Sequence, residues 1–300
     1  MKKLKKYIPL YVMLFPGALY LLINNYLPMF GIVIAFKDVD FRVGIFKSEW
    51  AGLSNFEYLF KTPDAFNITR NTILYNVAFI VATTVCSIFV AILLSELRNK
   101  VSVKIYQTLI LLPYLISMVI VSYLGYAFLS SDTGFINRIL ENFGLDPVSW
   151  YTQPGYWPAI LIIINTWKNV GYNSIIFLAS IMGIDGEMYE AAAMDGCTKW
   201  KEIRYITLPM LKPTVITLTL LQIGRIFYSD FGLFYQVPLN SGALIDITNT
   251  IDTYVYRGLT TLGDISMSSA ACVYQSLVGF VLVIFANWVT KKFSSENALF

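Results

Sequence analysis

Apolar residues form six long runs that shorter polar segments separate. The runs cover approximately residues 8–36, 73–95, 105–129, 157–182, 209–229 and 267–290. Each is long enough to cross a bilayer as a helix, which takes roughly 20 residues. The runs are continuous rather than alternating, which argues against the strands of a membrane barrel. The pattern therefore predicts an all-α, multi-pass membrane protein with six transmembrane helices in a single domain, residues 1–300.

The composition supports a lipid environment. Hydrophobic residues make up 56% of the chain and charged residues only 14%, whereas soluble domains carry about 25% charged residues. We expect the surface of this protein to contact the lipid bilayer and not a nucleic acid.

The first apolar run needs to be distinguished from a cleaved signal peptide, because four lysines precede it. It extends to Phe36, well beyond the roughly 7–15 residues of a signal-peptide core, and it has no small-residue cleavage site. We interpret it as a retained helix that Pro16 and Pro28 kink or loosen.

Positive charges orient the six helices. With the N-terminus inside, 13 lysines and arginines fall in cytoplasmic segments and 7 in outer segments. Loops rich in Lys and Arg stay in the cytoplasm. This asymmetry predicts that both termini and residues 185–208 are cytoplasmic, and that the outer loops are residues 37–72, 130–156 and 230–266. The last of these carries the turn-forming residues Pro238, Asn240, Ser241 and Gly242.

Residue types exclude several kinds of chemistry. The chain has no histidine and only three scattered cysteines, so no His-dependent catalytic group and no zinc site is visible. It also lacks the G-x-x-x-x-G-K-[ST] loop that binds ATP phosphates. We predict no catalytic residue, no metal site and no cofactor bound by this chain.

One compact polar segment interrupts the apolar sequence between the fourth and fifth runs. Asp185 is suited to cap a short helix, and Gly196 is suited to end it. Small side chains, Ala191 and Ala192, share a face of this helix with Asp195. A second helical segment, about 198–206, leads to Pro209, expected in the first turn of the next span. The segment either docks on a partner or lies on its own bundle, and these residues alone leave both open.

A family resemblance favours docking. The spacing Glu190-Ala191-Ala192, three residues, Gly196, nine residues, Ile206, one residue, Leu208-Pro209 resembles the complete EAA motif of permease subunits of ATP-binding-cassette importers. The stretches "YIPLYVMLFPGALYLL", "FRVGIFKSEWAGLSNFEYLF" and "SSENALF" are similar to the carbohydrate branch of that family, nearest to polysaccharide or oligosaccharide permeases.

The resemblance implies the type I importer permease fold, with residues 185–208 as a cytoplasmic coupling helix between helices four and five. Its ATPase-docking residues would be Glu190, Ala191, Ala192, Asp195 and Gly196. Implied partners are a second permease subunit, two ATPase subunits that use ATP and Mg, and an extracytoplasmic solute-binding protein that delivers a sugar. The implied location is the bacterial cytoplasmic membrane.

Polar residues within the spans are candidates for the sugar path. Intramembrane charges usually have a function or a partner, and sugars need hydroxyls, amides and aromatic rings. The candidates are Asn165, Lys168 and Tyr172 on the fourth span and Gln222 and Arg225 on the fifth. Positive charge would suit an acidic oligosaccharide. Alternatively, Lys168 and Arg225 are structural. A permease for a non-sugar solute and a membrane-embedded transferase are the other functions considered.

Overall fold

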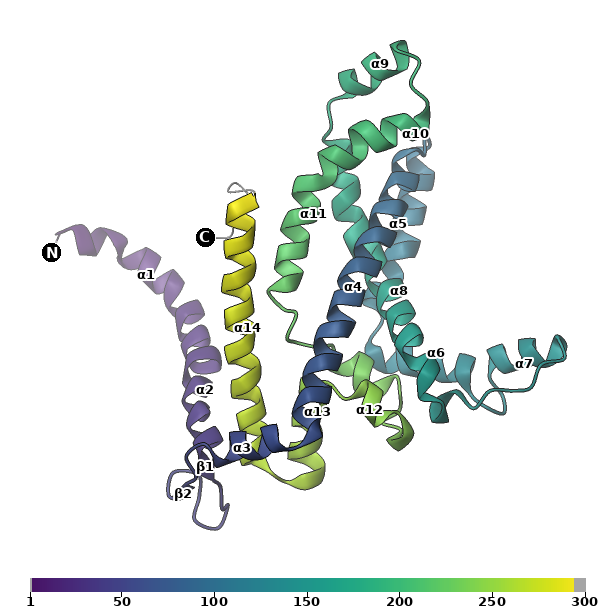
Figure 1. Ribbon diagram of the computed structural model, residues 1–300. Helices are drawn as coiled ribbons and strands as arrows, with labels where there is room; N and C mark the ends of the chain where they lie inside the picture. The colour runs from purple at the N-terminus through teal and green to yellow at the C-terminus, as the bar shows by residue number, and fades with distance from the viewer. Residues whose placement is uncertain (1, 294–300) are drawn as a thin grey trace. The chain divides into compact units, whose positions relative to one another are not determined.

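The computed structural model describes residues 2–293 and is almost entirely helical (Figure 1). The longer helices are α1 (Lys2–Leu21), α4 (Pro63–Ser95), α5 (Lys100–Leu115), α6 (Met118–Leu129), α8 (Trp157–Met182), α11 (Leu208–Ile223) and α14 (Ile265–Phe293). The shorter α-helices are α2 (Leu27–Met29), α3 (Ser54–Lys61), α7 (Phe135–Asn142), α9 (Gly186–Met194), α10 (Lys199–Glu202), α12 (Ile245–Thr248) and α13 (Ile251–Arg257).

Tighter and wider helical turns connect these helices. The 3₁₀ segments are η2 (Phe30–Phe36), η3 (Trp150–Thr152), η4 (Pro154–Tyr156) and η7 (Gly242–Leu244). The π segments are η1 (Leu22–Tyr26), η5 (Ile203–Thr207), η6 (Gly232–Gln236) and η8 (Gly258–Leu262). Two strands, β1 (Lys37–Asp38) and β2 (Glu49–Trp50), pair antiparallel.

Among residues 2–293, four helices are long and apolar enough to cross a membrane: Tyr7–Phe36, Pro63–Ser95, Lys199–Ile223 and Ile265–Val289. The pair α5 and α6 makes a fifth if it is counted as one bent span. Helix α8 has the predicted bounds, 157–182, but its amides and its lysine lower its hydropathy, and it is not one of these five.

The chain divides into two compact units. One contains the chain up to Ala65 together with Tyr254–Tyr274, and the other contains Phe66–Thr253 together with the chain from Gln275 onward. The sequence stretch "SSENALF" and residue 1 lie outside the described residues.

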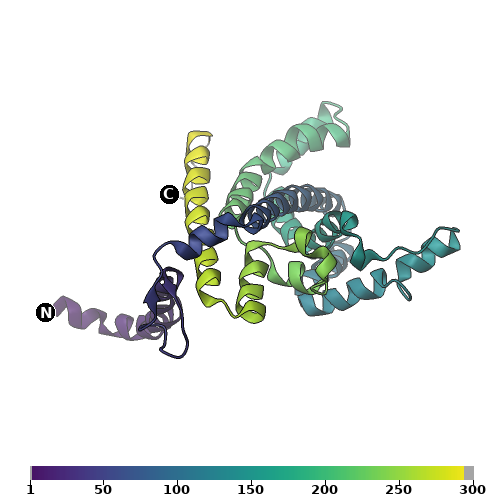
Figure 2. The ribbon, with the colours of Figure 1, turned by 60° about the horizontal axis from the view of Figure 1, so that its bottom comes forward.

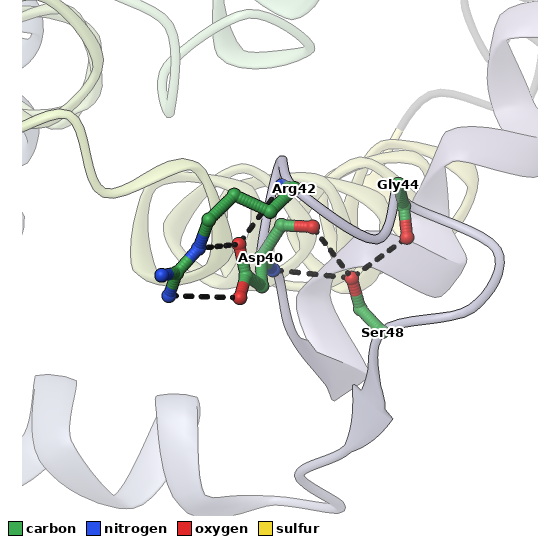
Figure 3. Close-up of polar contacts among 4 residues, drawn as sticks. All are labelled: Asp40, Arg42, Gly44 and Ser48. Atoms are coloured by element: carbon green, nitrogen blue, oxygen red, sulfur yellow. Dashed lines mark hydrogen bonds and ion pairs between the residues drawn. The ribbon is translucent and has the colours of Figure 1, made fainter.

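In the first unit, a hairpin loop joins β1 to β2. The Ser48 hydroxyl accepts a hydrogen bond from the Asp40 N–H (3.1 Å) and donates to the Gly44 carbonyl (2.8 Å) (Figure 3). The Arg42 side chain donates to the Asp40 carboxylate (3.1 Å), and this bond holds the pKa of that carboxyl below its usual range. The loop thus has a fixed conformation, although Phe46 at its tip is 94% exposed.

In the second unit, α5 and α8 pack with their backbones in close contact. A Cβ atom added to Gly171 would lie 1.8 Å from the Ile110 carbonyl oxygen, so only glycine fits there. At the start of α8, Trp157 and Leu161 are fully buried in a core that includes Leu233 and Phe234.

Residues 230–266, predicted as a turn-rich outer loop, contain short helical segments that contribute to this core. The turn around Pro238–Gly242 is present, with Leu239 and Asn240 at positive φ, but η6 and η7 flank it and Leu233, Phe234, Val237 and Leu244 are fully buried. Apolar runs this short do not resemble a span in sequence, although they pack against α4, α6 and α8.

The third predicted span is not one straight helix. Residues 105–129 form two helices that meet at an angle of 96°. Pro113 lacks the N–H that continues a helical hydrogen-bond ladder, and the Ser117 hydroxyl accepts the Ile120 N–H at the start of α6. Figures 1 and 2 show α5 alongside α8, with α6 and α7 leading away from them.

Pro209 lies in the first turn of α11, as predicted, but no break separates α11 from the helical turns before it. Helical structure runs from Lys199 to Ile223, because the π segment η5 precedes Pro209 and the Leu208 N–H bonds to the Ile203 carbonyl. The wider turn of a π segment moves the carbonyl one turn before the proline away from the proline ring. The segment η1 lies in the same position before Pro28, where the sequence predicted a loosened helix.

Candidate functional site

The segment between α8 and α11 contains the predicted short helix, α9. The Asp185 carboxylate accepts the Glu187 N–H at 3.0 Å and caps its N-terminus. At the other end Gly196 has a φ of +73°. The Gly196 N–H donates to Ala193 and the Cys197 N–H to Ala192, the hydrogen-bond pair of a Schellman motif. The predicted cap and terminator are confirmed.

Helix α9 lies at one end of the second unit, beyond the ends of α4, α5 and α8, whereas α12 lies at the opposite end (Figure 1). It buries none of its residues. Glu190, Ala191, Asp195 and Gly196 are exposed and Ala192 is half-buried. Nearby, Met194 is 89% exposed. The surface of this segment therefore combines small, polar and apolar side chains that no other described residue covers.

The chain after α9 is anchored to the rest of the unit by polar contacts. The Tyr189 and Thr207 hydroxyls are 3.0 Å apart. Lys199 pairs with Glu202 at 2.7 Å and with Glu96, just beyond the end of α4, at 3.7 Å. The Glu202 side chain is only 7% exposed, and a buried carboxylate requires such a partner. These contacts fix α10, and with it the start of the long helix, against α4.

A cavity of about 660 Å³, with many polar residues in its lining, lies between α4, α8 and α11 in the same unit. Four of the five predicted path residues line it, namely Asn165, Tyr172, Gln222 and Arg225. Further polar side chains in its lining are Asn76, Thr83, Asn169, Asn173, Tyr228, Ser229 and Asp230.

The amides and rings of this cavity are held in defined positions. The Asn169 amide donates to the Asn165 carbonyl at 2.9 Å and to its side-chain oxygen at 3.1 Å. The rings of Tyr114 and Tyr172 are stacked with their centroids 4.8 Å apart. The cavity wall therefore combines ordered amides with a flat aromatic surface.

Lys168 does not line the cavity, contrary to the prediction. Its ammonium donates to the carbonyls of Pro113 (3.3 Å) and Tyr114 (3.2 Å), and also to that of Ile116. These carbonyls lie at the end of α5, where a helix leaves its last C=O groups without partners. Lys168 thus stabilises the break between α5 and α6. This geometry matches the structural alternative for Lys168.

Arg225 does line the cavity, but it lies just beyond the helix that was expected to carry it. Helix α11 ends at Ile223, and consecutive turns follow, with the Arg225 N–H bonded to Gln222 and the Tyr228 N–H to Arg225. The Arg225 side chain is exposed. Within residues 2–293, its guanidinium has no hydrogen-bond or ion-pair partner.

Sequence reasoning missed the residues that hold this turn segment. The Asp252 carboxylate accepts the Ser229 N–H (2.6 Å) and hydroxyl (2.8 Å), and also the Gln275 amide at 3.2 Å. The amide of Asn76 donates to the carbonyls of Ile226 and Tyr228. Gln275 and Asn76 lie within spans, so their polarity was a usable signal. Asp252 lies in the expected loop and gave none.

No arrangement of residues suggests a metal site in the part of the chain that is described. Among residues 2–293, no three His, Cys, Asp or Glu side chains come together as ligands would.

Comparison with known proteins places this geometry in a family. Residues 83–295 match the family described as "Binding-protein-dependent transport system inner membrane component". Protein LplB of Bacillus subtilis (strain 168) is 36% identical over 289 residues, covering 96% of this chain and 90% of its own. The polygalacturonan/rhamnogalacturonan transport system permease protein YteP of the same organism is 36% identical over 288 residues, covering 96% and 89%.

A solved structure has the same fold over nearly the whole chain. A subunit in the crystal structure of a bacterial ABC transporter involved in the import of the acidic polysaccharide alginate is 33% identical. The match has a TM-score of 0.89 and covers 98% of each chain. Family match, relatives and fold agree, and the chain belongs to the binding-protein-dependent transport system inner membrane components.

Proposed function

We propose that this chain is a permease subunit of an ATP-driven importer and forms, with a second permease subunit, the membrane path for an oligosaccharide. The observation that carries the proposal is the cavity between α4, α8 and α11, with its ordered amides and stacked tyrosines. Amides bond sugar hydroxyls in defined directions, and aromatic faces pack against the C–H faces of the ring.

Similarity supports a sugar over another solute. Among similar permeases, YteP is named for polygalacturonan/rhamnogalacturonan, and AraP of Halalkalibacterium halodurans, 29% identical, is named for arabinooligosaccharides. The sn-glycerol-3-phosphate permease UgpA of Escherichia coli is also similar, but at 27% identity over 82% of this chain. The alternatives of a non-sugar solute and of a membrane transferase have less support, since no paired carboxylates or histidine offer catalytic chemistry.

The proposal assigns α9 as the coupling helix that docks on the ATPase subunit, where ATP and Mg are used. Its support is the exposure of Glu190, Ala191, Asp195 and Gly196, the position of α9 at the end of the unit, and the anchoring of the following helix. A knob with small side chains allows the backbone of a partner to approach closely.

Six helices cross the bacterial cytoplasmic membrane in this proposal. They are Tyr7–Phe36, α4, the bent pair α5–α6, α8, Lys199–Ile223 and α14. The polarity of α8 is compatible with a span because its amides line a cavity and do not face lipid. Charge asymmetry then gives α9 and both termini a cytoplasmic location, and a binding protein delivers the sugar on the other side. The alginate importer has also been crystallised with a periplasmic protein that carries an alginate pentasaccharide.

Reconstitution tests this function. The complete complex, co-expressed from its gene neighbourhood, is placed in proteoliposomes with ATP inside and binding protein outside. We expect ATP-dependent accumulation of labelled oligosaccharides, and none when the ATP is replaced by a non-hydrolysable analogue. Accumulation of no oligosaccharide, with an amino acid or a glycerol phosphate taken up instead, would overturn the proposal.

A further inference from the structure

We propose that Arg225 binds a carboxylate of the transported sugar, and that this permease conducts oligosaccharides containing uronic acids. The inference rests on the proposed function and specifies the chemical class of its substrate. It is derived from the state of the charged groups around the cavity.

Arg225 is the one cation of the described chain that lines the cavity. Lys168, the other cation predicted to lie on the sugar path, is bound to three carbonyls at the end of α5. The Arg225 guanidinium is exposed, and no described residue pairs with it. A guanidinium presents a planar fork of donors that matches both oxygens of a carboxylate.

The backbone near Arg225 does not need the guanidinium as a donor. Helix α11 ends at Ile223, and consecutive turns follow it. The Asn76 amide already donates to the Ile226 and Tyr228 carbonyls at 3.0 and 3.1 Å. The Gln275 amide donates to the Phe227 carbonyl at 2.7 Å. At the end of α11, the amides of Asn76 and Gln275 therefore donate to backbone carbonyls, as the Lys168 ammonium does at the end of α5.

The acidic group in the cavity lining does not neutralise Arg225 either. Asp230 is the only carboxylate that lines the described cavity, and its Oδ1 accepts the Leu233 N–H at 3.2 Å. It forms no ion pair with Arg225 within 4.0 Å. Positive charge near low-dielectric walls attracts an anion more strongly than the same charge in open water.

Neighbouring groups suit the rest of a uronate residue. Gln222 and Asn173 line the same cavity and supply amide donors and acceptors for hydroxyls. The stacked Tyr114 and Tyr172 rings supply an apolar face. The volume of about 660 Å³ is within the range of about 300–1,000 Å³ that is typical of small-molecule sites.

The test compares acidic and neutral forms of one sugar in the reconstituted complex. The probes are oligogalacturonates and alginate oligosaccharides, each as the free acid and as its methyl ester, together with neutral arabino-oligosaccharides. The variants are Arg225→Met, which removes the fork and its charge, and Arg225→Lys, which keeps the charge only. Arg138→Met, at an exposed position on α7, is the matched control. Uptake is divided by the amount of assembled complex. Each variant is compared with the wild type on the same probe, so the preference of the binding protein cancels.

We expect Arg225→Met to lower uptake of the acids at least tenfold and uptake of the esters less than threefold. Arg225→Lys is expected to be intermediate for the acids, and Arg138→Met to resemble the wild type. Equal losses for acid and ester, no loss for either, or failure of both Arg225 variants to assemble would overturn the inference. A wild-type complex that takes up neutral oligosaccharides but no acid also refutes it and leaves the proposed function intact. If no oligosaccharide of either class is taken up, the proposed function itself fails.

Discussion

Substitutions of Gly196 distinguish its effect on the conformation of α9 from its effect on the proposed contact with an ATPase subunit. Its φ is +73°, a region that costs most other residues roughly 1–2 kcal/mol. A Cβ atom added there meets no atom of the described chain within 4 Å. Substitutions by residues other than asparagine therefore have a similar backbone cost, and a Cβ atom adds no clash within the described chain.

The expected magnitudes follow from this geometry. For Gly196→Ala, roughly 1–2 kcal/mol shifts the ratio of ordered to frayed helix ends about 5- to 30-fold, so coupling weakens but persists. Gly196→Asn tolerates positive φ and should stay near the wild type. Gly196→Trp has the backbone cost of alanine, but it places a large side chain where the proposed ATPase cleft would lie. We expect it to release the ATPase.

Three measurements distinguish these outcomes, namely permease in the membrane, ATPase that co-purifies with it, and substrate-stimulated ATP hydrolysis together with uptake. All three variants should reach the membrane in normal amounts. If Gly196→Trp and Gly196→Ala have equal effects, Gly196 only terminates the helix and nothing docks beside it. Normal co-purification and normal uptake for Gly196→Trp would refute the reasoning altogether.

Other predictions follow from the packing and from the charge asymmetry. Although the Pro113 carbonyl keeps the Ile116 N–H as a donor, Lys168→Met removes the donor from the part-buried Ile116 carbonyl, which costs about 1–3 kcal/mol. It should lower the melting temperature and yield of the complex without changing the acid-to-ester uptake ratio, and a changed ratio would contradict the structural role. Gly171→Ala should prevent assembly because its Cβ would lie 1.8 Å from the Ile110 oxygen. Gly279→Ala, whose Cβ would have its nearest contact at 3.7 Å, should be tolerated. Gel filtration of detergent extracts compares the two variants. In a cysteine-free background, Lys199→Cys should react with an impermeant reagent only after the cells are opened, and labelling from outside would refute the topology.

The sequence predicted those parts of the fold that depend on local periodicity. Helix α8 begins and ends where its apolar run does, at Trp157 and Met182, and Asp185 and Gly196 end α9 because capping needs only neighbouring residues. The bend between α5 and α6 was missed because residues on both sides of Ser117 are apolar. Hydropathy does not register a proline that ends a helix in the middle of an apolar run.

The candidate site was predictable only in part, for a related reason. Asn165, Tyr172, Gln222 and Arg225 were predicted because polarity inside a span needs a purpose, and they line one cavity. Lys168 was grouped with them because sequence gives the depth of a charge and not its partners. Its partners are carbonyls that become available only where α5 ends, so its role depended on a bend that the sequence did not reveal.

One continuous helix connects the proposed docking segment to the proposed substrate contact. From Lys199 to Ile223 it has 25 residues, about 37 Å at 1.5 Å per residue, and Arg225 follows two residues later. Pro209 would interrupt a regular helix, but the wider turn of η5 accommodates it. Lys199, which also pairs with Glu202 of the same helix, ties the start of this helix to Glu96. Asp252 and Asn76 hold the turn segment beyond its end. Under the proposed function, a shift of α9 on the ATPase must therefore either bend this helix or break a contact at one of its ends. Because helices resist bending more than surface ion pairs resist breaking, the Lys199–Glu96 pair, at 3.7 Å and half-exposed, is the contact that yields first.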